Sequence, residues 1–175
     1  MASINNKKGQ KSNSAKGKKK KNTVEKQIET HIRKIIADNI LKKNRRFVML
    51  DSKDVVDILI CDNGKSPKLF FIEIKYYTKR KDRINIGDEN GDGYQPEILK
   101  NPPKYFENNL IWVFQRENDN NYYVLKTKDS SKYISGGSIG IKQNNFKISV
   151  FDDIKPLSEK DFLRFIKKWI TGKAL

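Results

Sequence analysis

The sequence predicts an α/β fold in which a mixed β-sheet is flanked by helices. Two segments with apolar residues at helical spacing, 24–41 and 159–171, lie near the two ends of the chain. Between them lie six short runs rich in β-branched and aromatic residues, separated by polar or glycine-containing turns. At 175 residues, this order of elements fits one domain with a tail.

The tail is expected to be a disordered basic arm, residues 1–22, in front of a folded domain, residues 23–175. The arm contains eight lysines, no acidic residue and almost no apolar residue, so it cannot bury enough surface to fold. It supplies half of the formal net charge of +16. The remaining domain is still strongly basic, which points to a polyanionic partner, most often nucleic acid.

The residue counts exclude several classes of protein. With one cysteine, Cys61, and one histidine, His31, the chain has neither an internal disulfide nor a histidine-based metal cluster. It has no apolar run near the ~20 residues of a membrane span and no signal-peptide core, so we expect a cytoplasmic protein. Enzyme chemistry would therefore rest on carboxylates, lysines and a bound ion.

The first helix is expected over 24–41, with Thr23 as its N-cap. Glu25 falls within the apolar stripe of this helix, and Glu29 lies at the edge of the stripe. The stripe consists of Val24, Ile28, Ile32, Ile35 and Ile36.

The first three strands are expected at 47–50, 55–61 and 69–77. Asn63 and Gly64 lie between the second and third runs and are typical of a hairpin turn. These two strands are therefore expected to pair with each other.

The second half begins with a charged and glycine-rich segment, 78–104, in which a short helix is expected to start near Pro96. Three further strands are expected at 110–115, 122–127 and 146–151. The last helix, 159–171, has a capping box formed by Ser158 and Asp161.

Two opposite charges interrupt the third strand. Because side chains alternate along a strand, Glu73 and Lys75 project from the same face, roughly 6.6 Å apart. Unpaired charges buried there would cost several kcal/mol, so they need a partner or a solvated cleft.

The second strand has a similar charge, Asp57, which the predicted hairpin brings near Glu73. Carboxylate oxygens of this kind suit Mg²⁺, which usually binds through one or two carboxylates and substrate phosphate. A lysine beside the ion could position a water molecule or offset phosphate charge. The alternative is a structural Glu–Lys pair on a half-exposed strand.

Asp57 followed by Glu73-Ile74-Lys75 on a hairpin resembles the PD-(D/E)xK nuclease superfamily. The resemblance implies a restriction-endonuclease-like fold and a Mg²⁺-dependent DNA endonuclease. Asp57, Glu73 and the Ile74 carbonyl would then bind the metal, and Lys75 would serve the attacking water. A glutamate from the first helix would assist, with Glu29 the better candidate and Glu25 the alternative. Val56 stands where the motif has proline, a position that does no chemistry.

Two activities within this superfamily fit the sequence. The long segment after the motif and the extra C-terminal strands resemble those of small type II restriction endonucleases, which act as homodimers on duplex DNA. The motif region is also similar to archaeal Holliday-junction resolvases. An alternative of another class is a non-catalytic nucleic-acid-binding protein.

The residues that follow the motif strand are candidates for contacts with DNA. A basic run directly after the strand is placed to bind phosphates, which gives affinity without sequence information. Gln95 could approach the metal-bound water or read an adenine edge in the major groove. The basic run consists of Lys79, Arg80, Lys81 and Arg83.

Overall fold

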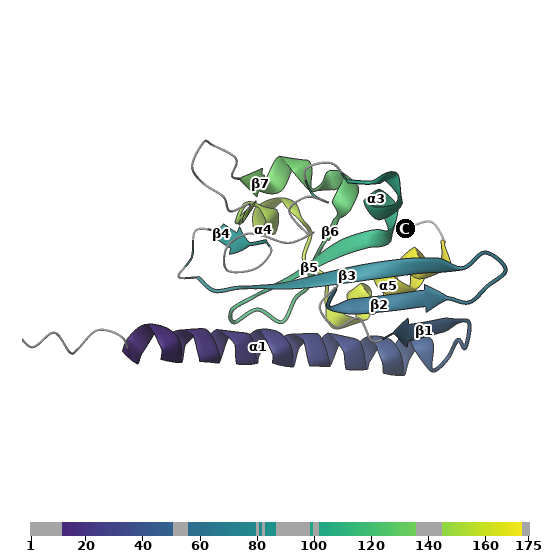
Figure 1. Ribbon diagram of the computed structural model, residues 1–175, viewed down its shortest axis with the longest axis horizontal. Helices are drawn as coiled ribbons and strands as arrows, with labels where there is room; N and C mark the ends of the chain where they lie inside the picture. The colour runs from purple at the N-terminus through teal and green to yellow at the C-terminus, as the bar shows by residue number, and fades with distance from the viewer. Residues whose placement is uncertain are drawn as a thin grey trace, which may run out of the picture.

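The computed structural model describes residues 12–50, 56–79, 81, 83–86, 99, 102–135 and 145–172, with the side chains of the first helix described from Val24 onward. Its centre is a mixed five-stranded sheet with helices against it (Figure 1). This arrangement confirms the predicted α/β class with a mixed sheet and flanking helices.

The five strands lie in the order β1-β2-β3-β5-β6. The first three are consecutive antiparallel neighbours, β3 pairs parallel with β5, and β5 pairs antiparallel with β6. β3 is therefore the central strand, as its apolar flanks on both faces predict. The strands are β1 (Phe47–Leu50), β2 (Ile58–Asp62), β3 (Lys68–Tyr77), β5 (Leu110–Arg116) and β6 (Tyr123–Lys126).

The β2–β3 hairpin is confirmed, but the predicted start of its first strand is wrong. β2 begins at Ile58, which pairs with Ile72, so Asp57 precedes the strand rather than lying within it. The physical reason is a hydrogen bond at this end of the ladder. The Asp57 side chain accepts the backbone N–H of Ile74, which another strand residue would otherwise have to satisfy.

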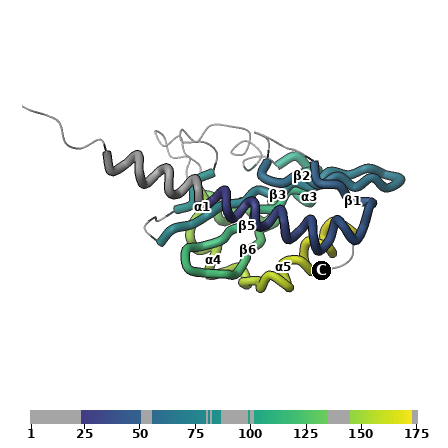
Figure 2. Tube along the Cα trace, turned by 90° about the horizontal axis from the view of Figure 1, so that it is seen from below, coloured from purple at the N-terminus to yellow at the C-terminus, as the bar shows by residue number. Residues whose placement is uncertain are grey.

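Two helices cover one face of the sheet. α1 (Ser12–Ile36) runs on through a π-helical turn, η1 (Ala37–Leu41), and lies beside α5 (Glu159–Thr171) (Figure 2). Their apolar sides meet strand residues in one core that includes Ile32, Ile36, Ile72, Ile111, Phe162 and Ile166. None of the helices in the described part of the chain is long and apolar enough to cross a membrane.

The start of the first helix differs from the prediction. α1 begins at Ser12 and passes through Thr23, which therefore is not its N-cap. Lysine and alanine favour helix and the segment contains no proline, so it can extend a helix that is already anchored by its apolar stripe, despite the cost of Gly17. The helix thus includes residues 12–22 of the expected arm, while residues 1–11 lie outside the described part.

α5 matches the prediction at both ends. The Ser158 side chain accepts a hydrogen bond from the backbone N–H of Asp161 at 3.2 Å. Gly172 follows the helix in the left-handed conformation, with φ of 68°, which glycine adopts at little cost.

A smaller three-stranded sheet, β4-β8-β7, covers part of the opposite face. It packs a second core that includes Trp112, Phe114, Tyr123 and Phe146. Of this sheet, the sequence predicted only part of β8, within the strand expected at 146–151. Its strands are β4 (Arg83–Asn85), β7 (Ile134–Ser135) and β8 (Asn145–Lys147).

The predicted strand over 146–151 is wrong beyond its first residues. β8 ends at Lys147, and a short helix, α4 (Val150–Asp153), begins three residues later. A strand would send Val150 and Phe151 to opposite faces, whereas the helical turn buries both against the second core.

A short helix, α3 (Lys104–Asn109), leads into β5 and covers the edge of the second core. Tyr105 links it to β3, because its hydroxyl donates to the Leu69 carbonyl at 3.0 Å and accepts from the Leu69 N–H at 2.7 Å. The helix expected near Pro96 lies outside the described residues.

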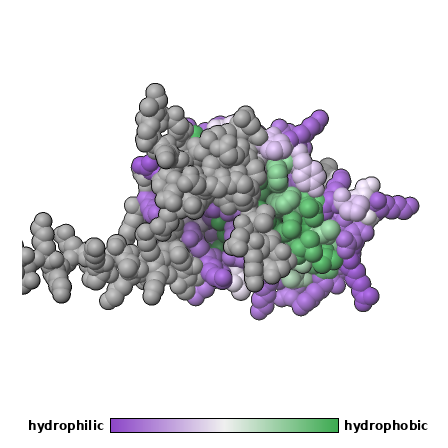
Figure 3. All heavy atoms as spheres, in the orientation of Figure 1, coloured by the Kyte–Doolittle hydropathy of each residue, from purple (hydrophilic) through white to green (hydrophobic). Residues whose placement is uncertain are grey.

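The opposite face is less covered over β1 and the adjoining parts of β2 and β3. Val48, Leu50 and Leu69 are between 36% and 39% exposed there. Figure 3 shows hydrophobic residues gathered on this part of the surface. The register places Val48 opposite Cys61, and Cys61 opposite Leu69, so these side chains follow one another across the sheet.

Candidate active site

Asp57 is fixed at the end of the β2–β3 ladder. Its Oδ2 accepts a hydrogen bond from the backbone N–H of Ile74 at 2.6 Å. The ladder ends with Ile58 opposite Ile72, so this N–H is the next one on the same edge of β3. The hydrogen bond ties the acid directly to the middle residue of Glu73-Ile74-Lys75.

Glu73 and Lys75 project from the same face of β3, as the alternation of a strand predicts. The Lys75 Nζ donates to Glu73 Oε1 at 2.7 Å, and the two side chains are 14% and 5% exposed. Their partners in the parallel register are Trp112 and Phe114, which belong to the second core. The charge pair therefore lies in a largely apolar surrounding, where each charge depends strongly on its neighbours.

Glu29 approaches the site from α1. Its Oε1 accepts a hydrogen bond from Arg33 Nε at 2.9 Å, and the guanidinium of Arg33 also donates to the backbone carbonyl of Asp57. The charge of Glu29 is one of those that act on Asp57, whereas the charge of Glu25 acts on Tyr76. Glu29 is thus linked to Asp57 through Arg33.

The environment of Asp57 favours its protonated form. Burial, followed by the negative charge of Glu73, raises the pKa of Asp57 to about 7. The Ile74 N–H and the charge of Lys75 act in the opposite direction. Glu73 is thus close enough to Asp57 to raise its pKa. Two neighbouring carboxylates of this kind can bind a cation, because the cation would stabilise the ionised forms of both.

The donor set fits a hard cation that keeps part of its water shell. Among the described residues, no three His, Cys, Asp or Glu side chains come together as a complete metal cage. Asp57 and Glu73 offer two carboxylates, which is the number that Mg²⁺ commonly takes from a protein when phosphate and water supply the rest. Oxygen ligands of this type do not suit zinc in a structural site.

The basic residues after β3 are only partly described. Lys79, Lys81 and Arg83 are exposed, which leaves their side chains accessible to a polyanion. The turn itself is held by its backbone, because the Lys79 N–H donates to Glu117 Oε2 and the Tyr77 hydroxyl donates to the Lys81 carbonyl. Arg80 and Gln95 lie outside the described residues.

Arg33 is the site residue that the sequence analysis did not identify. It connects Glu29, Asp57 and the sulfur of Met49, with Arg33 Nη1 at 3.9 Å from Met49 Sδ. Its spacing of four residues from Glu29 is the helical ion-pair spacing, which was the available signal. Its contact with Asp57 depends on tertiary packing and has no local signature.

Comparisons of the chain with models of protein families and with curated proteins find no match. The interpretation of the site therefore rests on its own residues and their geometry.

Proposed function

We propose that the chain is a Mg²⁺-dependent DNA endonuclease of the PD-(D/E)xK type. The observation that carries the proposal is the juxtaposition of Asp57, which directly precedes β2, with Glu73 and Lys75 on β3, joined through the Ile74 backbone. The formal net charge of +16 supports a polyanionic substrate.

Each residue has a distinct task in this proposal. Asp57 and Glu73 would hold the ion together with the Ile74 carbonyl, and the bound ion would supply a more acidic water and stabilise developing phosphate charge. Lys75 Nζ, held at Glu73, can donate to the attacking water or to a phosphate oxygen. Arg33 and Glu29 are positioning residues on α1. Arg33 donates a hydrogen bond to the Asp57 carbonyl, and Glu29 accepts one from Arg33 and so holds it in place.

Cleavage of a specific duplex sequence by a homodimer is the form of the activity that we propose. Two copies would cut both strands through two equivalent sites. The exposed Lys79, Lys81 and Arg83 would then hold phosphates beside the cut. Resolution of a four-way DNA junction would use the same site on a substrate of different shape. An experiment with both substrates distinguishes it from cleavage of duplex DNA.

The test uses supercoiled plasmids of different sequence and a synthetic four-way junction, each incubated with the full chain in Mg²⁺ and in EDTA. Discrete plasmid fragments that appear only with Mg²⁺ support the duplex-cutting form. Symmetric cuts in the junction support resolution instead. Tight binding of both DNAs without any cleavage would contradict the endonuclease proposal and favour a binding protein.

The residue assignment is tested with Glu73→Gln and Lys75→Ala. Glu107→Gln and Lys104→Ala on α3 are the matched controls, since they change the same residue types away from the site. Cleavage should be lost in the first pair and retained in the second, with all four variants folded by circular dichroism. A Glu73→Gln enzyme as active as the parent chain would refute the assignment.

A further inference from the structure

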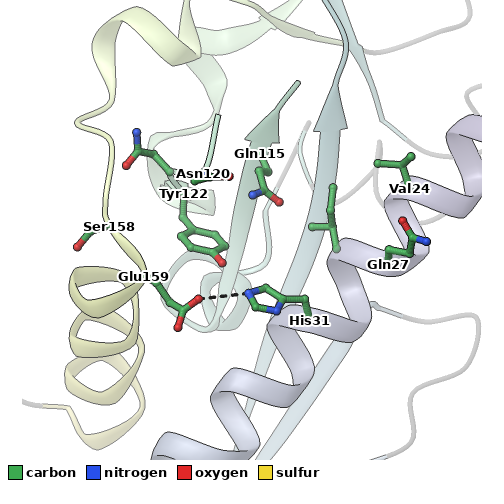
Figure 4. A pocket seen from close by; sticks show the side chains of 10 residues that line it. Val24, Gln27, His31, Gln115, Asn120, Tyr122, Ser158 and Glu159 are labelled. Atoms are coloured by element: carbon green, nitrogen blue, oxygen red, sulfur yellow. Dashed lines mark hydrogen bonds and ion pairs between the residues drawn. The ribbon is translucent and has the colours of Figure 1, made fainter. Parts of the chain in front are cut away.

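A cavity of about 630 Å³ lies between α1, the turn that joins β5 to β6, and the N-terminus of α5 (Figure 4). Its volume is in the range of small-molecule sites, roughly 300–1,000 Å³. Four residues of α1 line it, Val24, Gln27, Ile28 and His31. Of these, Gln27 and His31 are each two positions from Glu29 or Arg33 and project about 200° away from those side chains around the helix. The described lining includes none of Asp57, Glu73 and Lys75, so the cavity is separate from the candidate active site.

The charge of this cavity differs from that of the rest of the chain. The sequence has 37 lysines and arginines, yet the described residues that line the cavity include neither type. The charged group is Glu159, whose Oε2 lies 3.2 Å from His31 Nε2. This pair bridges α1 and α5 across the cavity mouth (Figure 4).

Tyr122 places a hydroxyl in the cavity. The residue is 2% exposed, and its ring stacks on Phe162 with ring centroids 4.5 Å apart. The hydroxyl points toward the open space near His31 (Figure 4) and makes no hydrogen bond to the described residues. Burial, followed by the charge of Glu159, raises the pKa of Tyr122 to about 12, so the hydroxyl is a proton donor at neutral pH. A hydroxyl donor that faces an open cavity can bond a ligand that supplies an acceptor.

The electrostatics disfavour an anionic ligand. The Glu159 carboxylate repels anions, which argues against a phosphate group inside the cavity. The positive partial charge at the N-terminus of α5 is offset by the Glu159 and Asp161 carboxylates of its first turn. A neutral ligand avoids the repulsion by Glu159.

The remaining walls define the shape and bonding of such a ligand. Val24 and Ile28 form an apolar wall on α1, while Gln27, Gln115 and Asn120 present side-chain amides. The Gln115 Nε2 also donates one hydrogen bond to the Asp119 carbonyl, at 3.4 Å. Each amide offers donors and an acceptor, the combination that pairs with the edge of a nucleobase. An apolar wall beside donors and acceptors suits a planar heterocycle.

We propose that this cavity binds a nucleobase, supplied either by a free nucleoside or by an unstacked nucleotide of a single strand. The Tyr122 hydroxyl and the amides of Gln27, Gln115 and Asn120 would bond the base edge, and Val24 and Ile28 would contact its face. The binding goes beyond the proposed nuclease activity and needs neither Mg²⁺ nor cleavage.

The experiment measures binding of the four nucleosides and of a 12-nucleotide single strand, with its abasic counterpart, by calorimetry in EDTA. Tyr122→Phe removes the hydroxyl and retains the stacked ring, and Asn120→Ala removes one exposed amide. Tyr105→Phe, which removes a hydroxyl on α3, is the matched control. Loss of one hydrogen bond should weaken binding roughly twofold to tenfold in the first two variants and leave it unchanged in the control.

The outcomes separate the two sources of the base. A nucleoside that binds the parent chain and loses affinity in Tyr122→Phe supports a site for free nucleosides. An intact strand that binds more tightly than its abasic counterpart, with a difference that Tyr122→Phe abolishes, supports an unstacked base. The proposal is overturned if nucleosides do not bind and the intact and abasic strands respond equally to every variant. Because all binding is measured without Mg²⁺, this result is independent of whether the chain cleaves DNA.

Discussion

The carboxylate of Asp57 and the backbone N–H of Ile74 are joined by a hydrogen bond of 2.6 Å, so one acid both ends a strand ladder and faces a second carboxylate. The structural and chemical roles of Asp57 can be separated by substitution. Asn retains an oxygen that accepts the Ile74 N–H, whereas Ala does not.

Folding raises the pKa of Asp57, so its ionised form destabilises the folded state, and Asp57→Asn should be at least as stable as the parent chain at neutral pH. Cleavage should nevertheless fall by at least about a hundredfold, because a proposed metal ligand loses its charge. Asp57→Ala should be less stable than Asp57→Asn by about 1–3 kcal/mol, because the Ile74 N–H is left without its acceptor. Urea unfolding and plasmid cleavage measure the two effects. An Asn variant that cleaves normally would show that the charge of Asp57 is not needed.

Arg33→Met should lower the unfolding free energy by about 1–3 kcal/mol, since it removes hydrogen bonds to Glu29 and to the Asp57 carbonyl. Cleavage should also fall at temperatures where the variant is folded, because Asp57 loses its support from α1. Arg33→Lys should be intermediate, since lysine keeps the charge without the planar fork.

The matched control is Arg164→Met, which breaks an exposed pair with Asp161 on α5. Exposed pairs contribute at most about 1 kcal/mol, so this variant should unfold close to the parent chain. Equal effects of the two substitutions would argue against a special role for Arg33.

Lys79→Ala and Lys81→Ala should weaken duplex binding similarly for all sequences, because phosphate contacts carry no sequence information. Each should reduce the slope of log K against log salt by about 1. Fluorescence anisotropy in EDTA at several salt concentrations measures the slope. Lys104→Ala on α3 is the control, and a slope that changes as much in the control would refute a local phosphate contact.

Asp119 provides a test of stability against pH. Burial alone would raise the pKa of Asp119, but hydrogen bonds from the Asn121 backbone, Tyr123 hydroxyl and Arg116 guanidinium outweigh it and lower the pKa to about 2. The folded-state pKa is then below the unfolded value of about 3.9. The stabilisation is complete above about pH 4 and is lost as the pH falls toward 2.

Asp119→Asn should thus cost roughly 2–3 kcal/mol at pH 7, and this difference from the parent chain should shrink between pH 4 and pH 2. Urea unfolding at pH 7, 4 and 3 measures it. Asp129→Asn, at an exposed site, should show no such change. A difference that is constant with pH would contradict the assigned hydrogen bonds.

Local patterns in the sequence predict the elements whose patterns are complete. The apolar stripe and the capping pair Ser158 and Asp161 define α5. Two apolar runs around a polar turn predict the β2–β3 hairpin, although its connection is the five residues 63–67 and not a two-residue turn at Asn63-Gly64. The alternation of β3 places Glu73 and Lys75 on one face. These features depend on residues near each other in the chain, so periodicity is sufficient.

Features that depend on tertiary contacts could not be predicted. The helical turn at Val150 and Phe151 exists because the second core lies on one side of both residues.

Burial of an acidic side chain is not by itself a sign of function. Asp62 is 2% exposed, but Arg46 binds both of its oxygens, at 2.5 and 2.6 Å. What distinguishes Asp57 is its proximity to Glu73.

The parallel pairing of β3 with β5 has a consequence for the order of folding. β1, β2 and β3 are joined through short connections, so their antiparallel ladders can form early. β5 joins β3 only after the intervening segment, 78–109, has closed, and such non-local pairing is intrinsically slow. Asp57 and Ile74 can therefore meet within the early hairpin. The apolar surrounding of Glu73 and Lys75, which Trp112 and Phe114 supply from β5, is completed last.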